Sequence, residues 1–295
     1  MRITISGATG LIGASLRQHL SAQGHELRCL SRKAPSQPGW YIWDPDSGAP
    51  PQDSLEDSDA VIHLAGEPVA QRWSAEVKRR IRSSREQGTQ ALVAGLAALP
   101  RKPRVLVSAS AIGYYGDRGD DVLSEKASPG SDFLSEVCVE WERSAHLADA
   151  LGIRVVCIRI GIVLAANGGA LAKMLPPFRM GLGGPIAGGQ AWMSWIHVED
   201  LARLFAWALE TPDVRGPVNA VSPGAVRNAA FTRSLSAALG RPALIPVPAL
   251  ALKLMYGEMA SVVLGSQHVV PDVAKQSGFQ FSWPGLDPAL RNLIS

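Results

Sequence analysis

Three glycines near the amino terminus have the spacing of a phosphate-binding turn. They follow an apolar run at residues 2–6 and open a helix-like segment. In such a turn the first glycine permits a tight bend, the second lets backbone N–H groups approach a pyrophosphate, and the third lets helix and strand pack closely. The helix N-terminus then offers free N–H donors to the negative charge. We therefore predict a dinucleotide site whose first residues are Gly7, Thr9, Gly10, Leu11, Ile12 and Gly13.

The end of the next apolar run discriminates between the two nicotinamide dinucleotides. An acidic residue at this position would bind the ribose hydroxyls of NAD and repel the 2′-phosphate of NADP. The chain has Ser31-Arg32-Lys33 there instead. Ser31 offers a hydroxyl, and the Arg32 guanidinium binds phosphate with two parallel hydrogen bonds. The alternative is an exposed basic turn without a ligand. Because Ser31 and Arg32 stand where the acidic residue would be, we favour NADPH or NADP as the cofactor.

The elements that must position these residues alternate between two patterns. Short apolar runs predict strands at residues 2–6, 27–30, 60–64, 104–108 and 154–159, and periodic segments predict helices at 10–23, 75–99 and 133–151. Repeated β-α-β units predict an α/β fold, a Rossmann-type doubly wound parallel sheet. We expect this domain to span residues 1–164, with 192–221 returning to it. Residues 165–191 and 222–295, rich in glycine and proline and then mainly helical, are expected to form a smaller substrate lobe.

Composition narrows the function classes. The 295 residues are 46% hydrophobic, and Lys+Arg 29 nearly balances Asp+Glu 26, which argues against a nucleic-acid partner. Three widely separated cysteines indicate neither disulfides nor a metal site. The amino terminus is not typical of a signal peptide, and prolines and charges interrupt the apolar stretch at 245–265, so no membrane partner is expected. We predict a cytoplasmic protein with a small-molecule substrate, for which a homodimer remains open.

Several motifs together resemble the extended short-chain dehydrogenase/reductase superfamily. The glycine turn matches its fingerprint, and so does the run Asp59–Gly66, whose end lies beside the cofactor in that superfamily. Ser108-Ala109-Ser110 followed by Tyr114-Tyr115-Gly116 resembles the segment that supplies the catalytic serine, with Ser110 as the match. The further cofactor-binding residues that the resemblance implies are Leu64, Ala65, Gly66, Arg85 and Ile160.

The chain departs from the superfamily where a Tyr-x-x-x-Lys pair is expected. Leu134 stands in place of the proton-transferring tyrosine, Cys138 in place of the lysine, and Arg85 in place of an upstream asparagine. These departures resemble one atypical subgroup, whose members are called epimerase family proteins and end in a domain of unknown function. The resemblance covers the whole chain and includes the segments 64–68, 72–73, 175–178, 181–185, 192–197, 257–259 and 278–281.

The catalytic candidates are therefore Ser110, Tyr114 and Cys138, and each has a structural alternative. Ser110 would hydrogen-bond a substrate carbonyl, or it caps a strand end. Either Tyr114 or Tyr115 would supply a proton while the other packs. A Cys138 thiolate beside Arg85 would act as base or nucleophile, but we favour a small buried side chain. Arg85 itself would contact the cofactor or an anionic substrate group, or form a surface ion pair.

Further along the chain, residues 165–190 with Arg179 are the expected substrate loop. Trp192 and Trp195 offer either a stacking face or packing for the lobe. His63 is expected in the core, and His197 in a structural or pocket-lining position. The leading prediction is an NADPH-binding oxidoreductase acting on a small carbonyl compound. A nucleotide-sugar epimerase and a non-catalytic NADPH sensor or scaffold are the alternatives.

Overall fold

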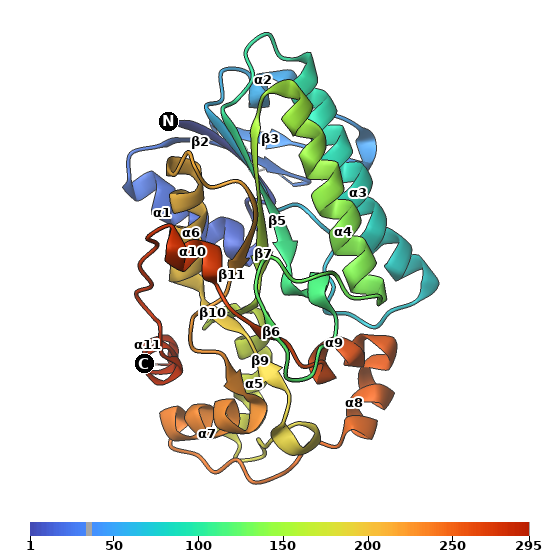
Figure 1. The fold of residues 1–295 in the computed structure, drawn as a ribbon, viewed down its shortest axis with the longest axis vertical. Coiled ribbons are helices and arrows are strands. Elements are labelled where there is room, and N and C mark those ends of the chain that lie inside the picture. Colours follow the sequence, from blue (N-terminus) through green and yellow to red (C-terminus); the bar gives the residue numbers. More distant parts are fainter. Residues whose placement is uncertain (34–36, 295) are drawn as a thin grey trace.

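The apolar runs of the first 220 residues form one parallel sheet at the centre of the molecule (Figure 1). The structure is a computed structural model that describes residues 1–33 and 37–294. Its strands, in spatial order, are β11 (Gly216–Ala220), β7 (Arg154–Ile160), β5 (Val105–Ala111), β4 (Ala60–His63), β1 (Arg2–Ser6), β2 (Glu26–Ser31) and β3 (Trp40–Ile42). All neighbours pair in parallel. The predicted Rossmann-type fold is confirmed.

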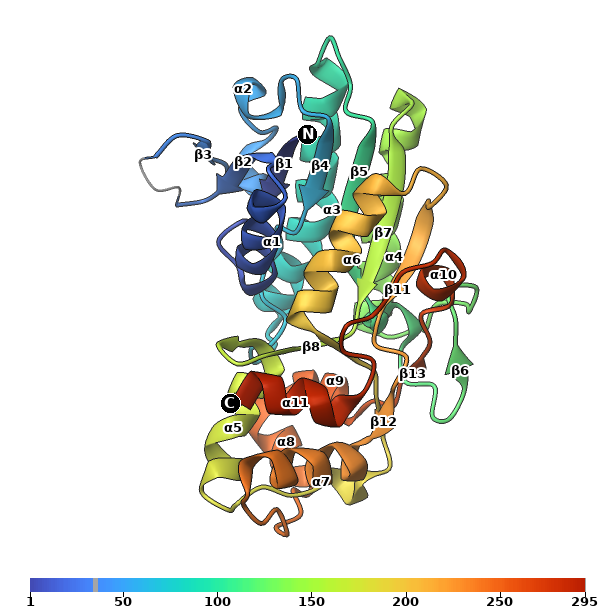
Figure 2. The same ribbon diagram turned by 90° about the vertical axis from the view of Figure 1, so that its left-hand side faces the viewer.

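Helices cover both faces of this sheet, which is why its central strands are apolar on both sides. Helices α1 (Leu11–Ala22) and α6 (Val198–Glu210) cover one face, and α3 (Ala75–Ala98) and α4 (Phe133–His146) cover the other (Figures 1 and 2). The connections contain the short helix α2 (Gln52–Leu55) and 3₁₀ turns at 45–47, 112–115, 147–151, 187–189 and 257–259. Ser74 and Asp132 begin α3 and α4 by accepting backbone N–H groups of the first turn.

The smaller lobe lies beyond the carboxyl ends of the strands (Figure 2). Its elements are β8 (Ile162–Ala165), α5 (Gly169–Arg179), β9 (Trp192–Met193), β10 (Trp195–His197), β12 (Val226–Arg227), α7 (Asn228–Leu239), α8 (Ala249–Tyr256), α9 (Ala260–Leu264) and α11 (Leu286–Ile294). Strand β10 pairs with β8, and β9 pairs with β12. Residues 192–197 therefore pair inside the lobe, and the chain returns to the sheet with α6.

Part of the C-terminal region packs against the sheet rather than within the lobe. Strand β13 (His268–Val269) pairs with β6 (Val122–Leu123), and α10 (Asp272–Gln276) lies beside β11. Ala274 and Phe279 are buried in the same core as Ile3 and Leu204. The core under the sheet is therefore completed by residues from near the end of the chain.

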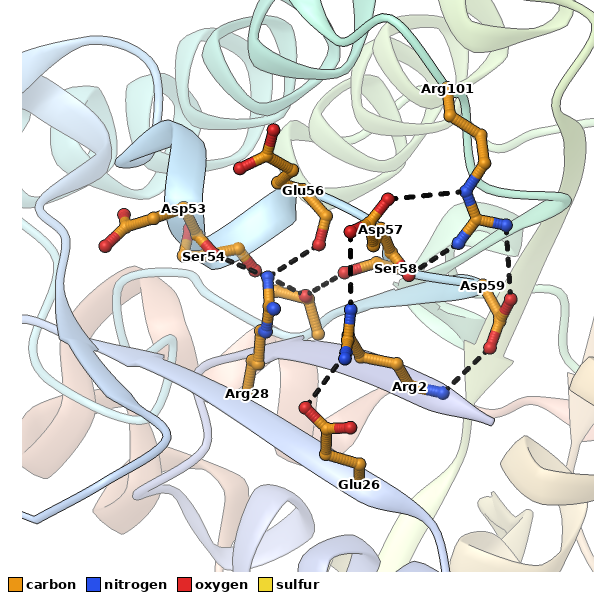
Figure 3. Close-up of polar contacts among 11 residues, drawn as sticks. Arg2, Glu26, Arg28, Asp53, Ser54, Glu56, Asp57, Ser58, Asp59 and Arg101 are labelled. Carbon is orange, nitrogen blue, oxygen red and sulfur yellow. Dashed lines mark hydrogen bonds and ion pairs between the residues drawn. The ribbon is translucent and has the colours of Figure 1, made fainter.

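Charged side chains cover the amino-terminal ends of the strands, at the end of the molecule remote from the lobe (Figure 3). Arg2 pairs with Glu26 at 2.9 Å and with Asp57 at 3.6 Å, and Arg101 pairs with Asp57 at 3.7 Å and Asp59 at 3.5 Å. Such exposed pairs each contribute about 0–1 kcal/mol. Both signs of charge are therefore present and paired at this end of the molecule.

Candidate functional site

The glycine turn has the close packing that its spacing predicts. Gly7 has φ +67°, and a Cβ on Gly13 would lie 2.4 Å from the Gly7 carbonyl oxygen. A side chain at position 13 would therefore force strand β1 and helix α1 apart. Helix α1 begins after Gly10 without a side-chain cap. Among the described residues the N–H groups of Leu11 and Ile12 have no hydrogen-bond partner, so they are available to an anion.

The end of β2 lies beside this turn. The Ser31 hydroxyl is 3.3 Å from the Thr9 hydroxyl and accepts a hydrogen bond from the Lys33 N–H at 3.4 Å. The Arg32 side chain is exposed, and no acidic group of the described residues pairs with it. A hydroxyl and an unpaired guanidinium thus stand where a ribose phosphate would meet the turn.

His63 holds the end of β4 in place. Its Nδ1 is hydrogen-bonded to the Ser6 hydroxyl at 2.6 Å, and its Nε2 to the Thr89 hydroxyl at 3.1 Å. Ser6 Oγ in turn accepts the N–H groups of Leu64 and Ala65. Burial, together with the charge of Arg85, lowers the pKa of His63 to about 4, so the ring is neutral. It is a satisfied core histidine that fixes the predicted cofactor-side segment 64–66.

Arg85 secures the same segment from helix α3. Its guanidinium donates to the carbonyl oxygens of Glu67 at 3.0 Å and Ile81 at 3.1 Å, and lies 4.9 Å from the Trp141 ring centre. A Cβ on Gly66 would lie 3.3 Å from Arg85 Cζ, so glycine allows this approach. Within the described chain Arg85 forms no ion pair, which leaves the surface ion-pair alternative without support.

Ser110 belongs to a buried polar network that sequence reasoning missed. Its hydroxyl donates to Glu142 Oε1 at 2.7 Å. Arg159 donates to both oxygens of the same carboxylate, from Nε and Nη2 at 2.8 Å each. Since its hydrogen is held by Glu142, the Ser110 hydroxyl can offer a ligand only its lone pairs. A signal was present: an arginine inside an apolar strand and a glutamate in a buried helix face require partners.

The structure distinguishes the two neighbouring tyrosines. Tyr115 is fully buried, donates to Asn219 Oδ1 at 2.7 Å and accepts from Arg159 at 3.0 Å. Burial raises its pKa to about 12, so Tyr115 is the packing residue. Tyr114 is half-buried, with the Arg159 guanidinium 3.5 Å above its ring centre. Among the described residues its hydroxyl has no hydrogen-bond partner, so this group is free to meet a ligand.

Cys138 is buried and only 3% exposed. Burial, followed by the negative charge of Glu142, raises the pKa of its thiol to about 12 despite the opposing charge of Arg85. A raised pKa keeps the thiol protonated at neutral pH. These observations support the small buried side chain over the reactive thiolate.

We expect Cys138 to resist alkylation in the folded protein. With a pKa of about 12, roughly one thiol in ten thousand is ionised at pH 8, and the thiolate is the reacting form. Labelling by iodoacetamide, followed by peptide mass analysis, should be at least about 100-fold slower than for free cysteine, and denaturant should abolish the protection. Buried Cys29 and Cys157 serve as internal references. Rapid labelling of Cys138 alone would contradict this expectation.

Neither Trp192 nor Trp195 leaves a ring face open to a substrate. Trp195 is fully buried and donates to the Gly224 carbonyl. The Trp192 ring is stacked on His268 at 3.9 Å and 10°, and the Arg227 guanidinium lies 4.3 Å from its centre. The coplanar histidine occupies one face, so the arginine must occupy the other. His197 caps α6 by accepting the Glu199 N–H, in agreement with the structural position expected for it.

Comparison with known proteins places this geometry in a family. Residues 3–222 match the NAD dependent epimerase/dehydratase family. The chain belongs to this family. Residues 247–293 match a second family, a domain of unknown function called DUF1731. In this NAD dependent epimerase/dehydratase family member, the first match covers the sheet and the lobe elements β8, α5, β9 and β10, and the DUF1731 match covers α8, α9 and most of α11. The resemblance to the extended short-chain dehydrogenase/reductases is confirmed.

Relatives of this family member are similar over the whole length of this chain. Epimerase family protein SDR39U1 of Homo sapiens is 37% identical, with 100% of both chains covered. The chloroplastic SDR39U1 homolog of Arabidopsis thaliana is 42% identical over 100% of this chain and 87% of its own. The crystal structure of human SDR39U1 (isoform 2) with NADPH superposes with a TM-score of 0.91 at 36% identity, covering 100% of this chain and 99% of the other.

A second solved structure carries a more specific name. The nucleoside-diphosphate sugar epimerase from Corynebacterium glutamicum is 34% identical with a TM-score of 0.82, covering 100% of this family member but 58% of its own chain. UDP-glucose 4-epimerase of Thermus thermophilus, at 18% identity, shows the fold alone. In the part of the chain that the structure describes, no helix is both long and apolar enough to span a bilayer.

Proposed function

We propose that this chain is a cytoplasmic NADPH-binding oxidoreductase that reduces a small carbonyl compound. The observation that supports NADPH as the cofactor is made at the end of β2. There Ser31 lies beside Thr9 and is followed by the unpaired Arg32, and no acidic residue stands at this position. The NADPH in the crystal structure of human SDR39U1 supports the same choice. The glycine turn fits a pyrophosphate because close backbone approach and free N–H groups coincide there.

The remaining cofactor residues would come from the carboxyl ends of the neighbouring strands. Leu64, Ala65 and Gly66 would lie along the dinucleotide, held by Ser6 and Arg85, and Ile160 ends β7 two strands away. When bound, NADPH supplies a hydride, so the protein has to orient the substrate and provide a proton.

Tyr114 is the proton donor in this proposal. Its hydroxyl is the phenolic group near Ser110 that no other described residue engages, whereas the Tyr115 hydroxyl is used within the core. Ser110, whose hydrogen points to Glu142, could only accept a hydrogen bond from an O–H or N–H group of the substrate and would not bind its carbonyl oxygen. Arg159 holds both residues, through Glu142 on one side and through the Tyr114 ring on the other.

We expect Tyr114→Phe to lower carbonyl-dependent NADPH oxidation by about 100-fold or more, because a positioned general acid contributes that much. The assay follows NADPH absorbance over a panel of aldehydes, ketones and quinones. Tyr41→Phe, on partly buried β3, is the matched control and should leave the rate unchanged. NADPH affinity should be equal in all three proteins. An undiminished rate in the Tyr114 variant would remove this residue from the mechanism.

A non-catalytic NADPH sensor or scaffold is the second candidate. It is favoured by the buried Cys138 and the engaged Ser110, which leave little of the superfamily's proton relay. A protein that binds NADPH tightly but oxidises it with no member of the panel would support this candidate over the reductase. Nucleotide-sugar epimerisation, suggested by the Corynebacterium relative, is tested by incubating the protein with UDP-sugars and following the configuration of the sugar by NMR, because this reaction leaves the redox state of the cofactor unchanged overall.

A further inference from the structure

The lobe exposes an unusual number of large aliphatic side chains. Leu244 is 83% exposed, Leu254 70%, Leu250 66% and Met180 65%. We call the set the apolar lobe surface, and it comprises Met180, Leu182, Leu244, Ile245, Leu250 and Leu254. Single exposed aliphatic residues are ordinary, but a group of them marks a surface that contacts something else.

Three segments bring these side chains together. The segment after α5 runs beside the segment before α8, with the Ile245 N–H donating to Gly183 at 3.1 Å and the Val247 N–H donating to Pro185 at 2.9 Å. Helix α8 begins two residues later and places Leu250 and Leu254 one turn apart on the same side. Leu252, on another side of α8, is 8% exposed and packs inward. These three segments belong to the lobe, which forms one end of the molecule in Figures 1 and 2.

The two stretches of chain that contain the apolar lobe surface carry cations but no acids. Residues 165–198 and 214–257 contain no aspartate or glutamate. The cations of the lobe within these two ranges are Lys173, Arg179, Arg227, Arg233, Arg241 and Lys253. Arg227 pairs with Asp120, and within the described chain the others have no acidic partner. Glu258, the next acid along the chain, pairs with Lys78. At the opposite end of the molecule, by contrast, arginines and acids alternate in ion pairs, as Figure 3 shows.

We propose that the lobe docks this protein on the surface of an anionic lipid membrane. Exposed aliphatic side chains in segments that also carry lysine and arginine but no acids are the pattern of a surface that lies in the lipid–water interface, with the apolar groups among the acyl chains and the cations at the headgroups. A second copy docked through the same surface by a two-fold axis would bring Arg241 and Lys253 against cations. Nucleic acid would match the charge but not the exposed leucines. No helix of residues 1–33 and 37–294 could cross a bilayer, so the proposed contact is with the membrane surface.

The test is flotation of the full-length protein with lipid vesicles. One set contains phosphatidylcholine alone, and the other contains phosphatidylcholine with one third phosphatidylglycerol. We expect binding to the anionic vesicles that is about tenfold or more stronger than to the neutral ones and that weakens with salt. Leu250→Ser/Leu254→Ser and Arg241→Glu/Lys253→Glu should each reduce it by about tenfold or more.

Matched controls change the same chemistry on the sheet domain. Ile42→Ser/Val122→Ser alters two equally exposed aliphatic residues, and Arg215→Glu/Lys275→Glu reverses two exposed cations. Both should bind within about twofold of the unmodified protein, since neither touches the lobe. Circular dichroism and NADPH affinity check that each variant is folded.

Three results would overturn the proposal. One is no flotation of the unmodified protein with anionic vesicles. Another is an equal loss of binding in the lobe variants and the controls. The third is a concentration-dependent dimer that Leu250→Ser/Leu254→Ser dissociates, because a second copy would then cover the apolar lobe surface. None of these results depends on turnover, so the proposed reductase activity stands or fails separately.

Discussion

Arg159→Met is expected to lower the free energy of unfolding by about 3–5 kcal/mol, because it leaves the Glu142 carboxylate buried without its cation. Arg159 is 3% exposed and binds both oxygens of Glu142, as well as the Tyr115 hydroxyl and the Glu125 carbonyl. One substitution therefore removes the donors of three buried acceptors. A loss of this size is a large part of the stability of a typical domain.

Urea unfolding followed by tryptophan fluorescence measures this effect. Arg159→Met/Glu142→Leu should recover a substantial part of the loss, because replacing both partners leaves no uncompensated charge. Arg143→Met breaks an exposed pair with Glu140 on the same helix and should change stability by no more than about 0.5 kcal/mol. If Arg159→Met and Arg143→Met had equal effects, the Glu142–Arg159 pair would not be a stabilising centre of this fold.

Arg32→Glu is expected to weaken NADPH binding by about 100-fold or more while NADH binding is retained or improved. The substitution removes a charge-assisted pair with the 2′-phosphate, worth about 1.5–3 kcal/mol, and adds a like charge in its place. The same glutamate can accept hydrogen bonds from the two ribose hydroxyls of NADH. Fluorescence titration with each cofactor measures the two affinities.

Lys33→Glu is the matched control, since Lys33 is the exposed neighbour and has an equal charge. If Arg32 contacts the phosphate directly, its variant should lose far more NADPH affinity than the Lys33 variant. Equal losses would point to a diffuse field rather than a contact, and unchanged binding of both cofactors would place the dinucleotide elsewhere.

The central sheet was predictable because its signals are local. Each long strand is an apolar run flanked by a periodic helix, and predicted and observed limits differ by few residues, as for β7 at 154–160. Strand β3 was missed, since three half-exposed residues at a sheet edge show no period. The return of Ala274 and Phe279 to the sheet core was also missed, because nothing in a short helical segment says which core it joins.

In the candidate site, too, features formed by neighbouring residues could be predicted, and contacts between distant residues could not. Glycine spacing and the Ser31–Arg32 pair are contiguous in sequence, so the turn could be predicted residue by residue. The role of Ser110 could not, because its partner Glu142 lies 32 residues away on another element. The two tyrosines are adjacent and chemically identical, and only the position of Arg159 and Asn219 distinguishes the buried one from the free one.

The contribution of Phe279 to the sheet core has a consequence for biosynthesis. The seven strands of the sheet have all been synthesised once the ribosome reaches residue 220. Ala274 and Phe279, which complete the core under that sheet, are added more than 50 residues later. At roughly 5–20 residues per second, the nascent sheet waits several seconds with part of its apolar surface uncovered. During that interval we expect the incomplete sheet to bind chaperones that recognise exposed apolar surface. The core under the sheet therefore closes only after residues 274–279 have been synthesised.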